Sequence, residues 1–251
     1  MRNIISILAC LLAFSADAAL LQLGTNLPSN VQVGTNLVQY VNVGTNRAWS
    51  RSSDVLTGLI AWWKMDGNAN DSIGVNNGTI VNATNATGKV NGCYGFNGTS
   101  AKINFGTVSF TNVSVCLWLN VDGGGVVEQY FLHLGSGAGD YSPLIYLTKS
   151  EGGYLLRVFS GAQITSAAPL PFNSWQHIEF TYDGTTATLF TNGIQLDQTT
   201  SMTIPTGARD VIFGKIRYYD LNWYSGLLDE VRIYNRALSS NEVLQVYNAT
   251  K

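Results

Sequence analysis

The sequence predicts an all-β protein of the sandwich or jelly-roll class, and three observations carry this prediction. Only 12% of the 251 residues are charged, 11% are aromatic, and glycine is abundant. Helical periodicity of apolar residues is nearly absent between the N-terminal apolar run and residue 238. From residue 59 onward, short alternating segments are separated by turn dipeptides instead. Many short strands with closely spaced turns are typical of sandwiches and jelly rolls.

The first 18 residues have the features of a secretory signal peptide. Arg2 supplies a positive charge, an apolar run extends from Ile4 to Phe14, and Ala16-Asp17-Ala18 forms a small-residue cleavage pattern. We therefore expect a secreted protein at an extracellular or cell-surface location. No later apolar run reaches the roughly 18 residues that a membrane-spanning helix needs, so no transmembrane segment is expected.

Charge and cysteine content narrow the partners and the covalent framework. The net charge is -2 and no basic patch interrupts the chain, which argues against a nucleic acid partner. Once the signal peptide is removed, Cys93 and Cys116 are the remaining cysteines. In an oxidising compartment they are a disulfide candidate, and two buried free thiols are an equally good interpretation.

A ten-residue repeat follows the signal peptide within an N-terminal segment that we place at residues 19–56. Its three units are Leu21–Asn26, Val31–Asn36 and Val41–Asn46, each apolar-polar-apolar and then Gly-Thr-Asn. Each unit predicts a short strand ending in a turn, and three units bury too little surface to fold alone. Residues 21–47 are thus either an assembly element that supports a homo-oligomer or a repetitive linker.

The remaining residues, 57–251, are predicted to form one β domain. The clearest hairpins have Asp183-Gly184 and Asn192-Gly193 at their turns, because these dipeptides accept positive φ angles. The expected strands are Leu59–Met65, Gly78–Val81, Tyr94–Phe96, Ala101–Phe105, Val113–Val121, Gln129–Leu134, Leu144–Leu147, Tyr154–Phe159, Trp175–Tyr182, Ala187–Thr191, Ile194–Asp197, Asp210–Gly214 and Ser225–Tyr234.

The last strand and the residues after it form the most informative stretch. Strict alternation places one set of side chains of this strand on the core face and the other set on a solvated face. The first set is Leu227, Asp229, Val231 and Ile233, and the second is Glu230, Arg232, Tyr234 and Arg236. Ser239 and Glu242 have the spacing of a capping box, which predicts a short C-terminal helix.

Several motifs occur in an order that resembles the laminin-G-like, concanavalin A-like lectin/glucanase jelly-roll domains. They span roughly residues 59 to 249 and comprise Ala61–Gly67, Gly95–Ser100, the strand that carries Trp118, the Trp175–Gly184 hairpin and Gly226–Glu230. The resemblance implies a concanavalin A-like jelly-roll sandwich with a short C-terminal helix. It also implies binding to a glycan or glycoconjugate as the commonest function of such domains.

An oxygen-rich loop makes calcium a candidate structural cofactor. Asp66, Asn68 and Asn70 stand at the i, i+2, i+4 spacing that wraps a hard cation. The resemblance implies a calcium ion shared between the opening loop and the closing strand, and Asp71 and Asp229 match those positions. The alternative is that these side chains only stabilise a turn.

A second loop is the best candidate for ligand binding, because sugar sites combine an aromatic platform with a few hydrogen-bonding side chains. Residues 218–224 hold three tyrosines, a tryptophan, an aspartate and an asparagine. We expect Tyr219, Asp220, Asn222 and Trp223 to contact ligand, although Trp223 and Tyr224 also fit an aromatic cluster that covers the sheet. The glycine-rich loop Gly135–Tyr141 is a further candidate for the same rim.

Catalytic signals are weak. Both histidines, His133 and His177, lie in apolar alternating segments, and none of the common hydrolase or nucleotide-binding motifs occurs. A glycosidase needs two carboxylates facing one bond, whereas Asp229 and Glu230 are adjacent on a strand. We therefore expect a non-catalytic carbohydrate-binding or adhesion module, not an enzyme. The alternative is a structural subunit of an extracellular or virion-associated assembly that displays the jelly roll and contacts other subunits through its repeats.

Overall fold

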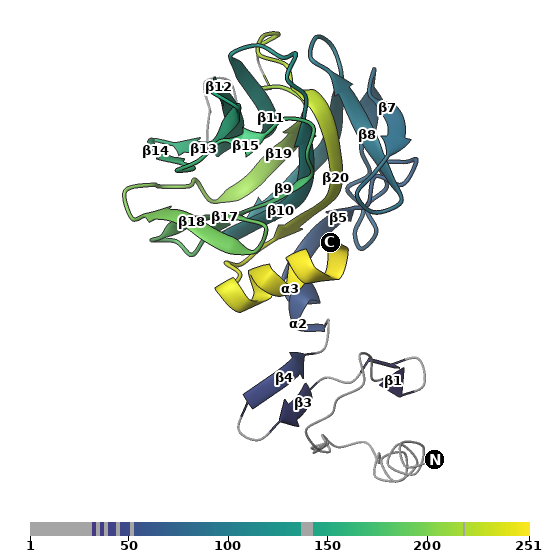
Figure 1. Cartoon of the computed structure of the whole chain (residues 1–251), viewed down its shortest axis with the longest axis vertical. Coiled ribbons are helices and arrows are strands. Elements are labelled where there is room, and N and C mark those ends of the chain that lie inside the picture. Colours follow the sequence, from purple (N-terminus) through teal and green to yellow (C-terminus); the bar gives the residue numbers. More distant parts are fainter. Residues whose placement is uncertain are drawn as a thin grey trace. The chain divides into compact units, whose positions relative to one another are not determined.

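A computed structural model describes residues 53–136, 143–217 and 219–251, together with four short strands between residues 32 and 50 (Figure 1). The chain divides into two units, Met1–Thr57 and Gly58–Lys251. The predicted signal peptide lies outside the described residues, as does most of the glycine-rich loop Gly135–Tyr141.

Two of the three repeats take part in short hairpins in the N-terminal unit. Strand β1 (Gln32–Val33) pairs with β2 (Asn36–Leu37), and β3 (Tyr40–Val43) pairs with β4 (Asn46–Ser50), each pair antiparallel. The innermost pairs, Val33 with Asn36 and Val43 with Asn46, stand at the same place in the two repeats. A four-residue helix, α2 (Ser53–Leu56), follows.

The second unit is a sandwich of two eight-stranded antiparallel sheets, which confirms the predicted fold class. The first sheet has the order β18-β17-β16-β10-β20-β8-β7, and β5 also pairs with β20. Its strands are β5 (Leu59–Trp63), β7 (Thr84–Thr87), β8 (Gly92–Asn97), β10 (Val113–Val121), β16 (Gln176–Tyr182), β17 (Ala187–Thr191), β18 (Ile194–Thr199) and β20 (Ser225–Tyr234).

The second sheet has the order β14-β13-β12-β11-β19-β9-β6, and β15 also pairs with β13. Its strands are β6 (Thr79–Val81), β9 (Lys102–Phe110), β11 (Glu128–Gly135), β12 (Leu144–Ser150), β13 (Gly153–Ser160), β14 (Ala162–Thr165), β15 (Leu170–Pro171) and β19 (Gly207–Phe213).

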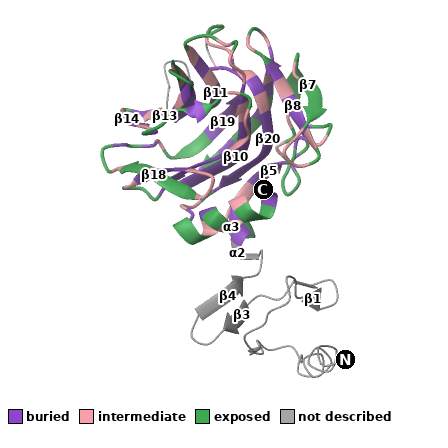
Figure 2. Cartoon of the chain, in the orientation of Figure 1, coloured by how far each residue is buried: buried purple, intermediate pink, exposed green. Residues whose placement is uncertain are grey.

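The hydrophobic core lies between the two sheets, where alternate residues of facing strands meet. Figure 2 shows buried residues along the central strands and exposed residues on the edge strands β7 and β18. Trp63, Phe105 and Phe213 are fully buried and pack against one another in tilted and edge-to-face arrangements, with ring centroids 4.1 to 6.3 Å apart. Such aromatic clusters stabilise a core beyond the area that they bury.

The closing strand β20 departs from the predicted alternation. A register shift relative to β10 falls between the pairs Cys116–Arg232 and Trp118–Asp229, and Glu230 has a φ of 50°. This β-bulge puts Leu228 in the core with Val231 and Ile233, and Asp229 on the face that carries Arg232 and Tyr234. The predicted facial assignment of Leu227 and Asp229 is therefore wrong. The predicted solvated face is also wrong, because Glu230, Arg232 and Tyr234 are all buried.

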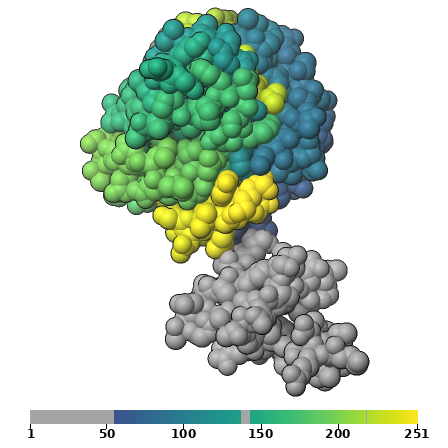
Figure 3. Space-filling model, viewed as in Figure 1, coloured from purple at the N-terminus to yellow at the C-terminus, as the bar shows by residue number. Residues whose placement is uncertain are grey.

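The predicted capping box begins the C-terminal helix α3 (Ser240–Thr250). The Ser239 hydroxyl accepts from the Glu242 amide, and the Glu242 carboxylate accepts from the Ser239 amide. Val243 and Val246 are buried, and Trp118 of β10 donates to the Thr250 hydroxyl at 2.9 Å. Figure 3 shows α3 in yellow on the domain surface beside β18. Gly193, directly before β18, lies close to Leu244 and Tyr247 of α3.

Cys93 and Cys116 are both buried free thiols, so the structure does not join the candidate disulfide pair. The Cys93 thiol donates to the Thr87 carbonyl at 3.3 Å, and burial raises its pKa to about 11. Among the described helices, none has the length and apolar character needed to cross a membrane.

Candidate functional site

The outer face of the second sheet carries a continuous row of side chains across seven strands. Directly paired residues point to the same side of a sheet. The row runs from β6 to β14 through Thr79, Asn104, Ile212, His133, Leu144, Phe159 and Gln163. Their chain neighbours Ile103, Phe105, Val211 and Phe213 point inward and are fully buried. This face therefore combines hydrogen-bonding groups at the β6 end with aromatic groups towards β14.

The loop between β19 and β20 contacts this face. The Tyr130 amide donates to the Asn222 carbonyl at 2.9 Å, and Trp223 forms an isolated bridge with Tyr130. The Arg217 amide donates to Nδ1 of His133 at 3.3 Å, while Ile216 packs with Leu144 and Tyr146 in a small apolar cluster. The loop is therefore fixed to the sheet at several points, and one side of it borders the β6–β9–β19 end.

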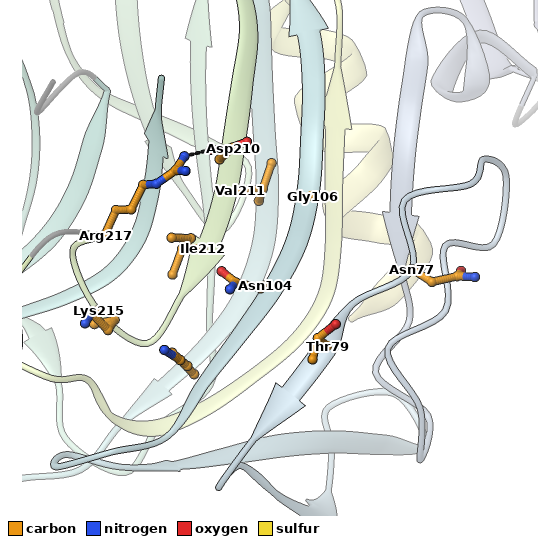
Figure 4. Close-up of a pocket in the computed structure, with 10 residues that line it drawn as sticks. Asn77, Thr79, Asn104, Gly106, Asp210, Val211, Ile212, Lys215 and Arg217 are labelled. Carbon is orange, nitrogen blue, oxygen red and sulfur yellow. Dashed lines mark ion pairs between the residues drawn. The ribbon is translucent and has the colours of Figure 1, made fainter. Parts of the chain in front are cut away.

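A pocket of about 560 Å³ lies at that end (Figure 4). Backbone pairing places Thr79, Asn104 and Ile212 side by side along its floor. The position of Gly106 leaves open space where a side chain would begin. The charged and polar residues that line the pocket include Thr79, Lys102, Asn104, Asp210, Lys215 and Arg217.

Ion pairs organise the charged residues of the pocket. Arg217 is paired with Asp210, as the dashed line in Figure 4 marks, and the Thr107 hydroxyl donates to the same carboxylate at 2.5 Å. Lys215, only 5% exposed, is paired with Asp220 and lies 4.7 Å from the Trp223 ring centroid. The hydrogen bond from Lys215, followed by its charge, lowers the pKa of Asp220, so this carboxylate is ionised at neutral pH.

The predicted ligand-binding residues lie on the loop that follows Lys215 and Arg217 of this pocket. Tyr219 is 43% exposed, Asp220 is exposed, and Asn222 and Trp223 are partly buried, whereas Tyr224 is fully buried in the core. Asp220 and Trp223 reach the pocket through Lys215. The Asn222 backbone positions the loop on β11.

Of the three aspartates predicted to bind metal, Asp71 has a local structural role. Its carboxylate accepts from the backbone amides of Trp62, Ile73 and Asn76, at 3.0 to 3.3 Å. A side chain at Gly74 would begin 2.4 Å from the same carboxylate, so the loop closes tightly around it. Asp71 thus stabilises the turn, which was the alternative considered from the sequence.

Asp66 and Asp229 both accept hydrogen bonds from a different loop, residues 88–92. Asp66 accepts from the Gly92 amide, and Asp229 accepts from the Val90 amide, both at 2.9 Å. A Cβ atom at Gly88 would lie 2.3 Å from the Gly92 carbonyl oxygen and 2.6 Å from Asp229 Oδ2, so these two oxygens border the same small space. Asp229 Oδ1 is buried without a hydrogen-bond partner, and burial raises the pKa of this carboxyl to about 7.

The described residues hold no group of three or more histidine, cysteine, aspartate or glutamate side chains that could bind a metal. Any cation at the 88–92 loop would therefore rely on two carboxylates and backbone carbonyl oxygens. Calcium accepts such mixed oxygen ligands. Asp66 and Asp229 fit that chemistry, whereas the Asp71 carboxylate accepts hydrogen bonds from the amides of residues 62, 73 and 76.

A buried polar row crosses the outer face of the first sheet. Glu179, Cys116 and Arg232 are direct neighbours on β16, β10 and β20, and His177 Nδ1 lies 3.6 Å from the Glu179 carboxylate. Burial raises the pKa of Glu179 well above its usual value, and burial together with the Arg232 charge lowers the pKa of His177 to about 3. His177 and Glu179 are 1% and 0% exposed, so this pair is out of reach of a substrate.

The sequence interpretation missed the pocket residues on the strands, although their polar side chains at alternating positions are visible in the sequence. Lys102, Asn104 and Gly106 alternate with the apolar residues of β9, and Lys215 and Arg217 stand directly before the aromatic loop. Polar positions on one face of strands far apart in the sequence become one site only once the strand order is known.

This architecture defines a β-sandwich module with a polar and aromatic outer face. Residues 96–244 match the laminin-G-type family described as the concanavalin A-like lectin/glucanases superfamily, and the chain belongs to that superfamily. No curated protein sequence matches the chain.

Solved structures share the fold. One of them is domain 4 of AbnA, a GH43 extracellular arabinanase from Geobacillus stearothermophilus, and the structure of this domain was determined in complex with arabinotriose. The domain is 25% identical to this chain, with a TM-score of 0.62, and the match covers 75% of this chain and 98% of that domain. The binding domain of Paraclostridial Mosquitocidal Protein 1 is 17% identical, with a TM-score of 0.61, over 78% of this chain. Trypanosoma rangeli sialidase is 16% identical, with a TM-score of 0.62, over 76% of this chain. The match spans 53% and 32% of those two chains.

Proposed function

We propose that this protein is a secreted, non-catalytic module that binds carbohydrate through the outer face of its second sheet. The observation that carries the proposal is the pocket at the β6–β9–β19 end, which is lined with hydrogen-bonding side chains and bordered by Trp223. Sugar sites need this combination, because a pyranose has polar hydroxyl groups around an apolar face.

Membership of the lectin/glucanase superfamily and the likeness to the arabinanase domain support this function. That domain is matched over nearly its whole length and was determined with an oligosaccharide, in an enzyme described as extracellular. The N-terminal signal-like sequence of this chain is consistent with the same location.

A non-catalytic role is supported by where the titratable groups lie. His177 and Glu179 are buried beneath the surface of the first sheet, on the opposite side of the sandwich from the pocket. Among the described residues, the carboxylate that lines the pocket is that of Asp210, which is already paired with Arg217. General acid catalysis of glycoside hydrolysis needs a second carboxyl group across the scissile bond.

A glycan array with the full chain tests the proposal. Asn104→Trp places a large side chain in the pocket from an exposed strand position, and we expect it to abolish the binding that the wild type shows. Gln195→Trp, on the exposed edge strand β18 of the other sheet, is the matched control and should bind as the wild type does. If the wild type binds no glycan, or if Asn104→Trp binds normally, the proposal is wrong.

We further propose that a structural calcium ion joins Asp66 and Asp229 at the 88–92 loop. Asp229 Oδ1 lacks a hydrogen-bond partner, and Asp229 Oδ2 and the Gly92 carbonyl border one space. Binding to the folded state alone would add about 2.7 kcal/mol of stability at a hundredfold excess over the Kd.

Chelation should therefore lower the melting temperature of the wild type and of Asp71→Asn. The Asp71→Asn variant weakens the hydrogen bonds that this side chain accepts from nearby backbone amides. Chelation should leave Asp66→Asn with Asp229→Asn unchanged. Equal melting curves of the wild type with and without chelator would exclude the ion.

The N-terminal repeats favour a second role as an assembly element. Strands β1 to β4 form two separate two-stranded sheets, and each strand of such a sheet has an edge available for pairing with another chain. Mass measurement by size-exclusion chromatography with and without residues 19–47 tests this role. A monomer in both cases would leave the repeats as a linker.

A further inference from the structure

The charge of the pocket specifies the class of carbohydrate, in an inference that rests on the proposed function. Among the described residues, three cationic side chains line the pocket, Lys102, Lys215 and Arg217, together with one anionic side chain, Asp210. The whole chain has a net charge of -2. The described lining of the pocket is thus net positive, which favours an anionic ligand over a cationic one.

Lys215 is the most informative of the three cations, because it is almost fully buried. A buried ammonium group is costly unless a negative charge compensates it. Its partner in the described residues is Asp220, whose side chain is 82% exposed on the loop that borders the pocket. The counter-ion of this buried cation is therefore a solvent-exposed carboxylate that a ligand can replace without unfolding the site.

Lys102 provides a second cation close to the first. It stands on β9 beside the pocket floor, makes no ion pair among the described residues, and its charge acts on Asp220 together with that of Lys215. Two positive charges of the pocket therefore act on Asp220. Arg217 differs, because Asp210 and the Gly135 carbonyl already accept from its guanidinium group.

We infer that the pocket binds an acidic sugar whose carboxylate or sulfate group takes the place of the Asp220 carboxylate on Lys215, with Lys102 as the second positive contact. Trp223, which packs against the Lys215 ammonium group, would then border the sugar ring. Asp220 acts as an internal competitor for the ligand, in contrast to the direct ligand contact predicted from the sequence.

Calorimetric titration of the full chain with three probes tests this inference. The probes are trigalacturonate, the corresponding neutral galactose trisaccharide, and a sulfated galactose trisaccharide. We expect one or both acidic probes to bind at least tenfold more tightly than the neutral one, and the preference to decrease as salt is raised because added ions screen the charges. The carboxylate and sulfate arms separate the two forms of acidic sugar.

Variants distinguish the inferred exchange from a merely structural role. Lys215→Gln should weaken binding of the acidic probe by roughly tenfold to a hundredfold, the range for a charged hydrogen bond. Asp220→Asn should tighten the same binding by about twofold to fivefold, because it removes the competing exposed ion pair. Lys64→Gln, at an exposed position directly after β5, and Asp197→Asn, at an exposed position on β18, remove the same charges and should leave binding unchanged.

The failure of this inference is distinct from failure of the proposed function. If the neutral probe binds as tightly as both acidic probes, the carbohydrate-binding function stands and the acidic specificity is refuted. If Asp220→Asn weakens binding of every probe, Asp220 contacts the sugar directly and the exchange on Lys215 is refuted. Because Asp220→Asn is predicted to gain affinity, loss of folding cannot imitate the expected result.

Discussion

The buried pair His177 and Glu179 makes a strong prediction about how stability depends on pH. His177 is 1% exposed, and burial followed by the nearby Arg232 charge lowers its pKa from 6.5 to about 3. Between these two pH values the unfolded chain binds a proton on this histidine and the folded chain does not. The folded state therefore loses stability as the pH falls from 6.5 towards 3.

The size of the effect follows from the pKa difference. At pH 4.5, two pH units below the unfolded pKa, the histidine alone costs about 2.7 kcal/mol at 1.36 kcal/mol per unit. His177→Gln cannot titrate in this range and should escape that loss. Urea unfolding of both proteins at pH 7 and at pH 4.5 measures the contribution of the histidine. This contribution is the fall in unfolding free energy of the wild type between the two pH values, minus the fall for His177→Gln.

Glu179 provides a control of opposite sign. Burial raises the pKa of its carboxyl group well above 4.5, so the folded state holds a proton that the unfolded state releases. Stability from this group is present below pH 4.5 and is lost as the pH rises through the folded pKa. Removing it in Glu179→Gln should therefore reduce the loss of stability at high pH. Parallel pH profiles for the wild type and His177→Gln would refute the assignment of a buried neutral histidine.

Three further predictions concern local structure. Ser239→Ala removes the helix cap and should lower the unfolding free energy by about 1 kcal/mol, measured as a fall in melting temperature of roughly 2 to 4 °C. Gly88→Ala places a methyl group 2.3 Å from the Gly92 carbonyl oxygen and should lower the unfolding free energy by about 1 to 3 kcal/mol in a urea titration. Gly124→Ala is the control, because the nearest atom to its new methyl group lies at 3.5 Å, and its unfolding free energy should be close to that of the wild type. Thr250→Val leaves the buried Trp118 indole N–H without its acceptor and should lower the unfolding free energy by about 1 to 3 kcal/mol. Hydrogen exchange should show α3 opening more often than in the wild type. Unchanged protection of α3 would contradict this packing.

Much of the fold was predictable because the decisive signals are local. Strands β10 and β20 begin and end where alternation and flanking turn residues predict. The capping box of α3 is likewise encoded within four residues. In contrast, β7 reads Thr-Asn-Ala-Thr and is exposed at all four positions. Its extended conformation follows from pairing with β8 and has no apolar pattern of its own.

One error originates in backbone geometry that an alternating pattern does not encode. The face assigned to Asp229 was wrong because alternation was extended through a bulge at Glu230, and nothing in the local sequence specifies that φ angle. Asp71, the other residue that the sequence interpretation matched to a calcium site, is a separate case, and its role as a metal ligand stays a prediction. The structure places it on the amides of its own loop, while Asp66 approaches Asp229 through residues 88–92.

The loop beside the candidate pocket could be predicted for the same reason. The aromatic loop is conspicuous in one stretch of sequence, so Asp220 and Trp223 were predicted beside a binding surface. The pocket itself joins Thr79, Asn104 and Lys215, which are far apart in the chain and are brought together by the order β6-β9-β19.

The most direct test of carbohydrate binding at this pocket is an NMR titration of the full chain with the glycan that it binds best on the array. The proposed site predicts that the largest chemical-shift changes occur at the amides of Asn104, Asp210 and Lys215 and at the Trp223 indole. Changes centred on the first sheet around Trp62, with those four signals unmoved, would contradict it.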